Sequence, residues 1–209
     1  LERLAAREGV LLLPVADYSR WYSTLPEKMR LEVEKAFGPP PGDLMTIERD
    51  GRAYFVIPKL DYGNVIVLPQ PVRGAKMDAK LQHNDRVPPP HQYLAVYWWL
   101  REVWKADVIL NYGTHGTHEF LPGRPLGQLA DDWSDRTLGS LPNLYVYVMD
   151  NVGEALIAKR RGSAVTVSHQ IPPVAPAEIA REDTTVAELY RSTERFLTQD
   201  DRALKERLR

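Results

Sequence analysis

The feature that most constrains the fold is an alternation of strands and helices in the second half of the chain. Short apolar runs occur at 107–112 (DVILNY), 142–150 (PNLYVYVMD) and 164–169 (AVTVSH), and a helical segment at 154–162 (EALIAKRRG) separates the last two. Short apolar runs bounded by turn signals are typical of buried strands. Strands that alternate with helices favour a parallel sheet. We therefore predict an α/β fold with a mostly parallel sheet flanked by helices.

The first half of the chain carries further local signals. Thr24 to Glu27 (TLPE) matches a capping box, which predicts a helix that runs to about Phe37. Asp50-Gly51 lies between two strand-like runs, which indicates a hairpin. Additional strands are expected at 9–16 and 63–71, and a helix with a broad apolar face is expected at 91–106.

The end of the chain differs from the rest. Another capping box, Thr185 to Glu188, predicts a charged amphipathic helix that continues close to Arg209. We divide the chain into an α/β core segment, 1–175, and this C-terminal helix, 176–209. The sequence begins with Leu1 rather than Met, and Leu1 already belongs to a segment that looks structured. We therefore expect a piece of a larger multidomain chain.

Composition excludes several classes of protein. The formal net charge of −1 over 209 residues gives no case for a nucleic-acid partner, and the absence of cysteine excludes disulfides and thiolate metal sites. No apolar run approaches the length of a membrane span. We expect a cytoplasmic protein. The phosphate-binding pattern GxxxxGK[ST] is absent, so ATP, if the reaction uses it, should be bound by a partner.

The stretch NYGTHGTHEFLPGRP (111–125) concentrates the chemistry. His115, His118 and Glu119 have i, i+3, i+4 spacing in a glycine-containing loop that follows a predicted strand. Ligands of α/β proteins bind beyond the carboxyl ends of such strands. Imidazole with carboxylate suits Zn, Co, Fe or Ni better than Mg or Ca, and the same groups could move protons. Spacing alone leaves a second interpretation open, in which Thr114, His115 and Thr117 satisfy loop backbone groups and His118 is solvated.

Each of the other candidate residues could instead have a purely structural or surface role. His83, in a polar loop, could be a solvated residue, and His91, after three prolines, could serve as a cap or lie on the surface. His169 ends a predicted strand, where a hydrogen-bonded structural role is common. The cations of AKRRG (158–162) could clamp ligand carboxylates, but cations are also favoured at helix C-termini.

Three stretches in this order carry a resemblance to a known family. They are GNVIVLPQPVRG (63–74), HNDRVPPPHQYLAVYWWL (83–100) and the long run 106–173 that contains GTHGTHE. The chain resembles the large-subunit family of class I tetrapyrrole metal chelatases over roughly residues 55–175. That family contains the cobaltochelatase large subunit of cobalamin synthesis and the H subunit of magnesium chelatase. GTHGTHE, with His118, and LPQPVRG look closer to the cobalt branch.

The resemblance implies a function. In that family the macrocycle is held by the large subunit, and two AAA+-type partner subunits use ATP to drive insertion of the metal. It implies that this chain inserts Co²⁺ into a corrin precursor of the hydrogenobyrinic acid a,c-diamide type. Carried over by motif, the catalytic candidates are Glu119 and His115, and the metal ligands are His115, His118 and Glu119. Candidates for contacts with the macrocycle are His83, His91, Arg73, Lys159, Arg160 and Arg161.

Two departures from the family pattern and three rival functions accompany this prediction. Asn111 stands where the family usually has His, and Arg124 replaces a Lys. Insertion of Mg²⁺ into protoporphyrin IX is the rival within the family. A non-catalytic tetrapyrrole-binding module is a rival from another class. A metallohydrolase is disfavoured because the HExxH spacing is absent.

Overall fold

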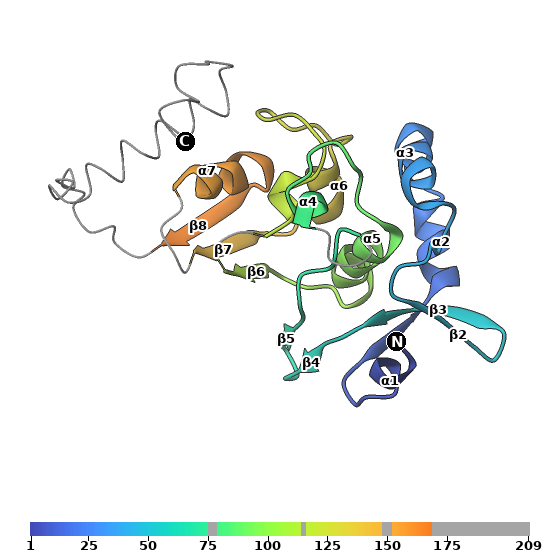
Figure 1. Cartoon of the computed structure of the whole chain (residues 1–209). Coiled ribbons are helices and arrows are strands. Elements are labelled where there is room, and N and C mark those ends of the chain that lie inside the picture. The colour runs from blue at the N-terminus through green and yellow to red at the C-terminus, as the bar shows by residue number, and fades with distance from the viewer. Residues whose placement is uncertain (75–78, 114–115, 148–151, 169–209) are drawn as a thin grey trace, which may run out of the picture. The chain divides into compact units, whose positions relative to one another are not determined.

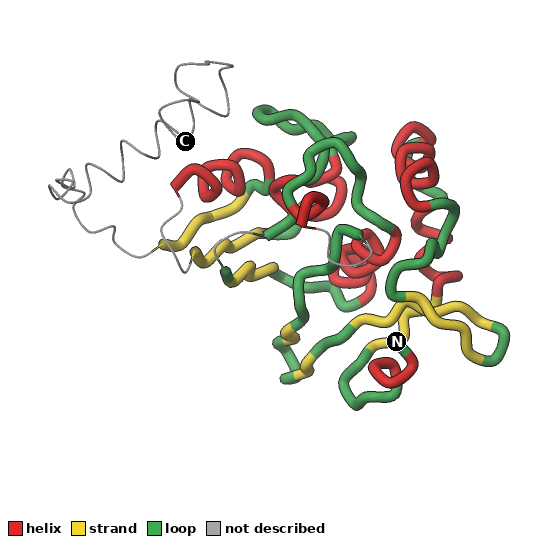
Figure 2. The backbone as a smooth tube through the Cα atoms, viewed as in Figure 1, coloured by secondary structure: helices red, strands yellow, loops and turns green. Residues whose placement is uncertain are grey.

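The computed structural model describes residues 1–74, 79–113, 116–147 and 152–168. Figures 1 and 2 show the order of the elements along this part of the chain. The helices are α1 (Glu2–Ala5), α2 (Val15–Tyr22), α3 (Glu27–Phe37), α4 (Ala79–Gln82), α5 (His91–Trp98), the π-helix η2 (Trp99–Val103), the 3-10 helix η3 (His118–Phe120), α6 (Trp133–Leu138) and α7 (Val152–Arg161). The strands are β1 (Leu11–Pro14), β2 (Thr46–Arg49), β3 (Arg52–Ile57), β4 (Leu60–Asp61), β5 (Ile66–Val67), β6 (Ile109–Tyr112), β7 (Asn143–Tyr147) and β8 (Ala164–Ser168).

The N-terminal strands form antiparallel sheets. β1, β3 and β2 lie side by side in that order, and β4 pairs with β5. Asp50 and Gly51 join β2 to β3 with φ values of 50° and 70°. Two successive positive φ angles match the right-handed twist of a two-residue hairpin, so the predicted hairpin is confirmed.

A parallel sheet of three strands occupies the second half of the described chain. Its order is β6-β7-β8, and its register aligns Ile109 with Asn143 and Asn143 with Ala164. Helix α7 connects β7 to β8 and packs against β8 and η3 (Figure 1). The predicted α/β fold with a parallel sheet is confirmed. Among the described strands, parallel pairing is confined to this sheet.

The principal core joins the two halves of the described chain. It extends from Leu13 in β1 to Leu138 in α6 and includes every residue of α5 from Tyr93 to Trp98. A helix that is apolar on all sides must be buried. The indole Nε1 of Trp133 also donates a hydrogen bond to the carboxylate of Glu32 in α3, across 101 positions of sequence. These contacts bind α3 and α6 into one structural unit.

The predicted helix at 91–106 is confirmed, but its second part is not a regular α-helix. Over Trp99–Val103 the backbone adopts π geometry, and the N–H of Trp104 donates to the carbonyl of Trp99 at 2.8 Å. This turn directs Arg101 towards α6, where its guanidinium donates to the carbonyls of Arg136 and Thr137 at 2.8 and 3.2 Å. Arg101 therefore caps the C-terminus of α6.

The predicted capping box at Thr24 is wrong, although the helix after it is confirmed. α3 begins at Glu27 with Pro26 as its N-cap and no side-chain cap. The hydroxyl of Thr24 donates instead to the carbonyl of Trp21, at the end of α2. Thr24 thus completes the preceding helix, which the sequence pattern did not predict.

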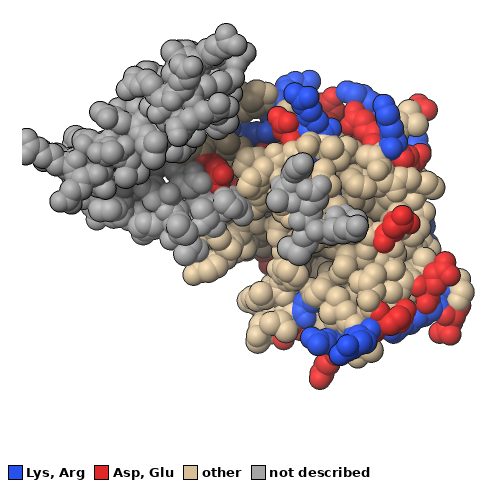
Figure 3. Space-filling model, in the orientation of Figure 1, with Lys and Arg blue, Asp and Glu red and all other residues tan. Residues whose placement is uncertain are grey.

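Other predictions have mixed outcomes. Of the strand predicted at 63–71, only Ile66–Val67 is a strand. The C-terminal helix and His169 lie outside the described residues. In the described part of the chain, no helix has the length and apolar character needed to cross a bilayer. Figure 3 shows charged side chains gathered at the margins of the visible face, with few at its centre.

Candidate functional site

Glu119 is the most distinctive polar side chain of the predicted motif. It lies in η3 and is 1% exposed. One carboxylate oxygen, Oε1, accepts hydrogen bonds from the backbone N–H of Gly116 at 3.0 Å and from the hydroxyl of Tyr145 at 3.1 Å. The other oxygen, Oε2, is buried and has no hydrogen-bond partner among the described residues. A buried carboxylate oxygen without a partner is costly, so this one is a candidate ligand-binding atom.

Gly116 leaves space next to that free oxygen. A Cβ at this position would lie 2.9 Å from the Tyr145 hydroxyl and 3.3 Å from Oε2. The first separation is shorter than real Cβ contacts, so a side chain there would displace the carboxylate or the tyrosine. Gly116 itself is half-buried. The glycine therefore permits the close approach of backbone, phenol and carboxylate.

His118 is buried and hydrogen-bonded. Its Nε2 lies 2.8 Å from the carbonyl of Ser134 and 2.9 Å from the hydroxyl of Thr137, so this nitrogen carries a proton. Burial lowers the pKa of His118 to about 4, which keeps the ring neutral at neutral pH. Its other nitrogen, Nδ1, lies against Gly162, where a Cβ would be 3.2 Å away. The alternative that His118 is solvated is wrong, and its role as a metal ligand stays a prediction.

Thr117, the residue two positions before Glu119, takes part in a network of polar side chains. The amide nitrogen of Gln70 lies 3.0 Å from the Thr117 hydroxyl and 3.0 and 3.1 Å from the hydroxyls of Tyr93 and Tyr97. Thr117 also contacts the Tyr93 hydroxyl directly, at 3.1 Å. Burial raises the pKa of both tyrosines, so both phenols are protonated and can donate. The network fixes the backbone that leads into Glu119.

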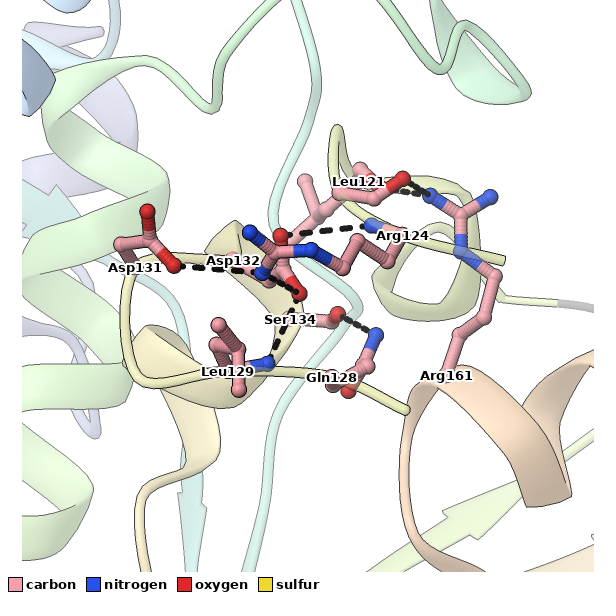
Figure 4. Close-up of polar contacts among 9 residues, drawn as sticks. Leu121, Arg124, Gln128, Leu129, Asp131, Asp132, Ser134 and Arg161 are labelled. Atoms are coloured by element: carbon pink, nitrogen blue, oxygen red, sulfur yellow. Dashed lines mark hydrogen bonds and ion pairs between the residues drawn. The ribbon is translucent and has the colours of Figure 1, made fainter. Parts of the chain in front are cut away.

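Two buried arginines hold the backbone on either side of Glu119. Arg73 is 1% exposed and donates to the carbonyls of Asn84 and Val87, and more weakly to that of Thr117 at 3.5 Å. Arg161, from α7, donates to the carbonyl of Leu121 at 2.5 Å, as Figure 4 shows. Both guanidinium groups bind backbone oxygens in this structure. Their predicted contact with the macrocycle stays a prediction.

The loop after Glu119 is ordered by Asp132. Its carboxylate accepts hydrogen bonds from the backbone N–H groups of Arg124 and Leu129, and it forms an ion pair with the Arg124 guanidinium at 3.3 Å (Figure 4). Gln128 also donates to Ser134, the residue whose carbonyl binds His118. Arg124, which replaces the family's usual Lys, thus contacts acidic residues of its own loop.

Asn111, the other departure from the family pattern, belongs to a chain of amides across the sheet. Its side-chain nitrogen donates to the amide oxygen of Asn143 in β7 at 2.7 Å. Asn143 in turn donates to the carbonyl of Gly162 at 2.8 Å. An amide can donate and accept in this position, whereas it cannot act as a base.

The remaining predicted site residues are dispersed. His91 is buried, and its ring contacts the hydroxyl of Tyr18 at 2.9 Å and the carbonyl of Gly38 at 3.0 Å. The exposed His83 lies against the ring of Phe120, with centroids 4.2 Å apart. Lys159 and Arg160 are exposed on α7. The alternative that His91 lies on the surface is wrong, and contacts of these four with the macrocycle stay predictions.

His115 lies outside the described residues. Within the described ranges no group of three His, Asp or Glu side chains is arranged to hold a metal ion. The described part of the site is therefore the carboxylate of Glu119 together with the residues that hold it and its backbone in place. Sequence reasoning missed Tyr145, Gln70 and Asn143. No local pattern pointed to Tyr145, because its place beside the motif depends on the register of β7 with β6 in the folded sheet.

The described chain is an α/β protein in which a buried carboxylate, a candidate ligand-binding group, follows a strand of a parallel sheet. Comparison with known proteins gives the family. The chain belongs to the CobN/magnesium chelatase family, whose model matches residues 2–209.

Individual relatives come from both branches of the family. The aerobic cobaltochelatase subunit CobN of Pseudomonas aeruginosa is 41% identical over 179 residues, or 85% of this chain and 14% of that protein. The magnesium-chelatase H subunit of Cereibacter sphaeroides is 42% identical over 151 residues, or 72% of this chain and 12% of that protein. The catalytic subunit of cobaltochelatase from Mycobacterium tuberculosis has a similar structure, with a TM-score of 0.69 and 34% identity over 91% of this chain and 17% of that one. The chain thus spans only 12–17% of the length of these relatives.

Proposed function

We propose that this chain carries metal-handling residues of a large chelatase subunit that inserts Co²⁺ into a corrin precursor in cobalamin synthesis. The observation that carries the proposal is Glu119, a buried carboxylate with one oxygen held by two donors and the other without a partner among the described residues. The corrin precursor is of the hydrogenobyrinic acid a,c-diamide type.

The proposed chemistry explains why a carboxylate is useful here. Insertion removes water from the ion and the inner N–H protons from the ring nitrogens of the macrocycle. Glu119 either holds the ion through Oε2 or accepts a ring proton there. His115 is proposed as the second group, as a ligand or proton acceptor. A site with few protein ligands keeps coordination positions open, so the ion can leave for the macrocycle.

Partner subunits are part of the proposal. The chain has no GxxxxGK[ST] motif, so we assign ATP hydrolysis to two AAA+-type subunits. The similarity to subunits of cobaltochelatase and magnesium chelatase supports this division of labour. We propose that the assembly works in the cytoplasm.

Replacement of Glu119 by Gln tests the proposal. Insertion of Co²⁺, measured with the ATPase partners, ATP and macrocycle present, should fall by at least roughly 100-fold, because loss of a group that accepts protons typically costs that much or more. Binding of the macrocycle, measured by quenching of tryptophan fluorescence, should be kept. Full insertion by Glu119→Gln would exclude the assignment. Macrocycle binding without insertion by the unaltered chain would favour a non-catalytic binding module.

Insertion of Mg²⁺ into protoporphyrin IX is the second candidate, because the H subunit of a magnesium chelatase is 42% identical over 72% of this chain, beside 41% over 85% for the cobalt relative. Imidazole and carboxylate together favour Co²⁺ over Mg²⁺. Parallel insertion assays with Co²⁺ and a corrin precursor, and with Mg²⁺ and protoporphyrin IX, separate the two.

A further inference from the structure

The two carboxylate oxygens of Glu119 have different hydrogen bonding, which affects how the group can bind a cation. Oε1 receives two hydrogen bonds, whereas Oε2 receives none from the described residues. A carboxylate can bind a cation through one oxygen or through both. Two donors occupy the lone pairs of Oε1 and draw charge away from the group. Only Oε2 then remains available to a cation.

The two donors come from different parts of the structure. Tyr145 is 3% exposed and belongs to β7, the central strand of the parallel sheet. Gly116 supplies a backbone N–H three positions before Glu119. Arg161 holds the carbonyl of Leu121, two positions after Glu119. The carboxylate therefore has little freedom to rotate and present Oε1 to a ligand.

We infer that Tyr145 is a positioning residue that restricts Glu119 to weak, single-oxygen binding of the substrate cation. This inference rests on the proposed function. An ion held through one oxygen of a charge-depleted carboxylate exchanges readily, which suits a site that must pass its metal to a macrocycle. Tight coordination would retain the ion.

Tyr145→Phe should have an unusual effect on metal affinity. Loss of an ordinary supporting residue in a metal site weakens metal affinity, typically by 10–100-fold. Here the loss of the hydroxyl removes one of the two donors to Oε1 and returns charge to the carboxylate. The dissociation constant for Co²⁺ should therefore fall, by about tenfold, since a hydrogen bond to a charged group is worth about that factor. The rate of insertion should fall at the same time.

Gly116→Ala should change affinity in the opposite direction. Its Cβ would lie 3.3 Å from Oε2 and 2.9 Å from the Tyr145 hydroxyl, so it would crowd the oxygen that is free to bind. The φ angle of Gly116 lies outside the positive range, so the backbone accepts alanine. Co²⁺ binding should weaken. Two variants with opposite signs separate this role from a general loss of structure.

The experiment is a Co²⁺ titration of the chain, followed by visible absorption, for the unaltered protein and for Tyr145→Phe, Gly116→Ala and Glu119→Gln. Tyr22→Phe is the matched control, because it removes a buried hydroxyl that donates to the carbonyl of Arg30, in the N-terminal helices. Insertion rates with the ATPase partners are measured in parallel, and circular dichroism checks folding. Tighter binding with slower insertion in Tyr145→Phe, and an unchanged control, support the inference.

Unchanged or weaker binding in Tyr145→Phe overturns it. If Glu119→Gln still abolishes insertion in that case, the proposed function stands and only the role of Tyr145 is wrong. If no Co²⁺ binding depends on Glu119, both the inference and the assignment of the ion to Glu119 are wrong.

Discussion

His118 and Glu119 are neighbours in sequence and both are buried, yet their hydrogen bonds give them opposite roles. The Nε2 of His118 contacts two residues of α6, Ser134 and Thr137. Glu119 points towards β7 and keeps one oxygen without a described partner. The hydrogen bonds of His118 therefore anchor the motif to the fold, whereas Glu119 keeps an oxygen that is a candidate for ligand binding.

His91 makes the stability of the protein sensitive to acid. Burial lowers the pKa of His91, so the unfolded chain binds a proton more readily than the folded one. Stability should be highest above the usual histidine pKa of about 6.5 and should fall as the pH drops from there towards the lowered pKa of the folded state. His91→Gln should lose less stability over this window than the unaltered protein.

Urea unfolding at pH 7.5 and at pH 5.0 measures the difference. His83→Gln is the control, because it removes an exposed imidazole from the same chain. An equal loss of stability in His91→Gln and the unaltered protein would contradict the prediction. His118 acts in the same direction, so some acid sensitivity should persist in the variant.

For single residues, the sequence indicated the segment that forms the candidate site, but not the hydrogen-bond partners of its side chains. The spacing of His118 and Glu119 singled out the motif. The partners of His118 come from α6, a helix of six residues without a clear apolar period, which the pattern did not predict. The partner of Glu119 comes from a strand whose register only the folded sheet reveals. Such long-range partners cannot be read from local spacing.

At the scale of elements, the connection between η2 and α6 shows how a helix end is satisfied from outside. The last carbonyls of a helix have no partners within it. Arg101 supplies donors to two of them. Gly139 follows α6 with φ 58° and ψ −130°, and a Cβ there would lie 3.0 Å from the Arg101 guanidinium. The glycine is needed both for its backbone conformation and for this close approach.

Gly139→Ala should therefore destabilise the protein by about 2 kcal/mol or more, through backbone strain and displacement of Arg101. Gly127→Ala is the matched control, because Gly127 has φ 63° but nothing within 4 Å of its added Cβ. The control should cost only about 1 kcal/mol of backbone strain. Equal changes in the midpoint of urea unfolding would show that the contact with Arg101 contributes nothing.

Elements with a local physical cause were predictable, and those with a distant cause were not. The hairpin at Asp50-Gly51 follows from two residues that tolerate positive φ. The π turn over Trp99–Val103 has no such local signal, because it accompanies the contact of Arg101 with α6. The cap assigned to Thr24 was wrong because α2, which its hydroxyl completes, was not predicted.

At the scale of the whole described unit, the parallel sheet has two unlike faces. Ile109, Asn143 and Ala164 form a row on one face, where α7 packs against β8 and Ile109 packs against the principal core. On the other face the register aligns Leu110, Leu144 and Val165 in one row, and Tyr112, Val146 and Val167 in the next. Leu110, Tyr112, Val165 and Val167 are 49–76% exposed. Parallel sheets are normally covered on both faces, so this apolar surface is exceptional.

The isolated chain should therefore self-associate as its concentration rises. Threonine keeps the strand preference of valine while adding a hydroxyl, so Val165→Thr with Val167→Thr should shift the population towards monomer without unfolding β8. Sedimentation velocity over a series of concentrations measures the shift. Val103→Thr, at an exposed position in η2, is the control. An equal shift in the control, or none in the double variant, would exclude this face as the cause.

The shared core also affects the rate of folding and the order in which elements form. Trp133 reaches Glu32 across 101 positions, and α5 packs against residues from β1 to α6. Contacts between residues so distant along the chain must wait for large loops to close, which makes folding slow. Neither α2 and α3 nor α6 has a separate core to fold around first. The residues of this core should therefore acquire structure in one late step, and the buried indole of Trp133 should contribute to the fluorescence change of that step in stopped-flow measurements.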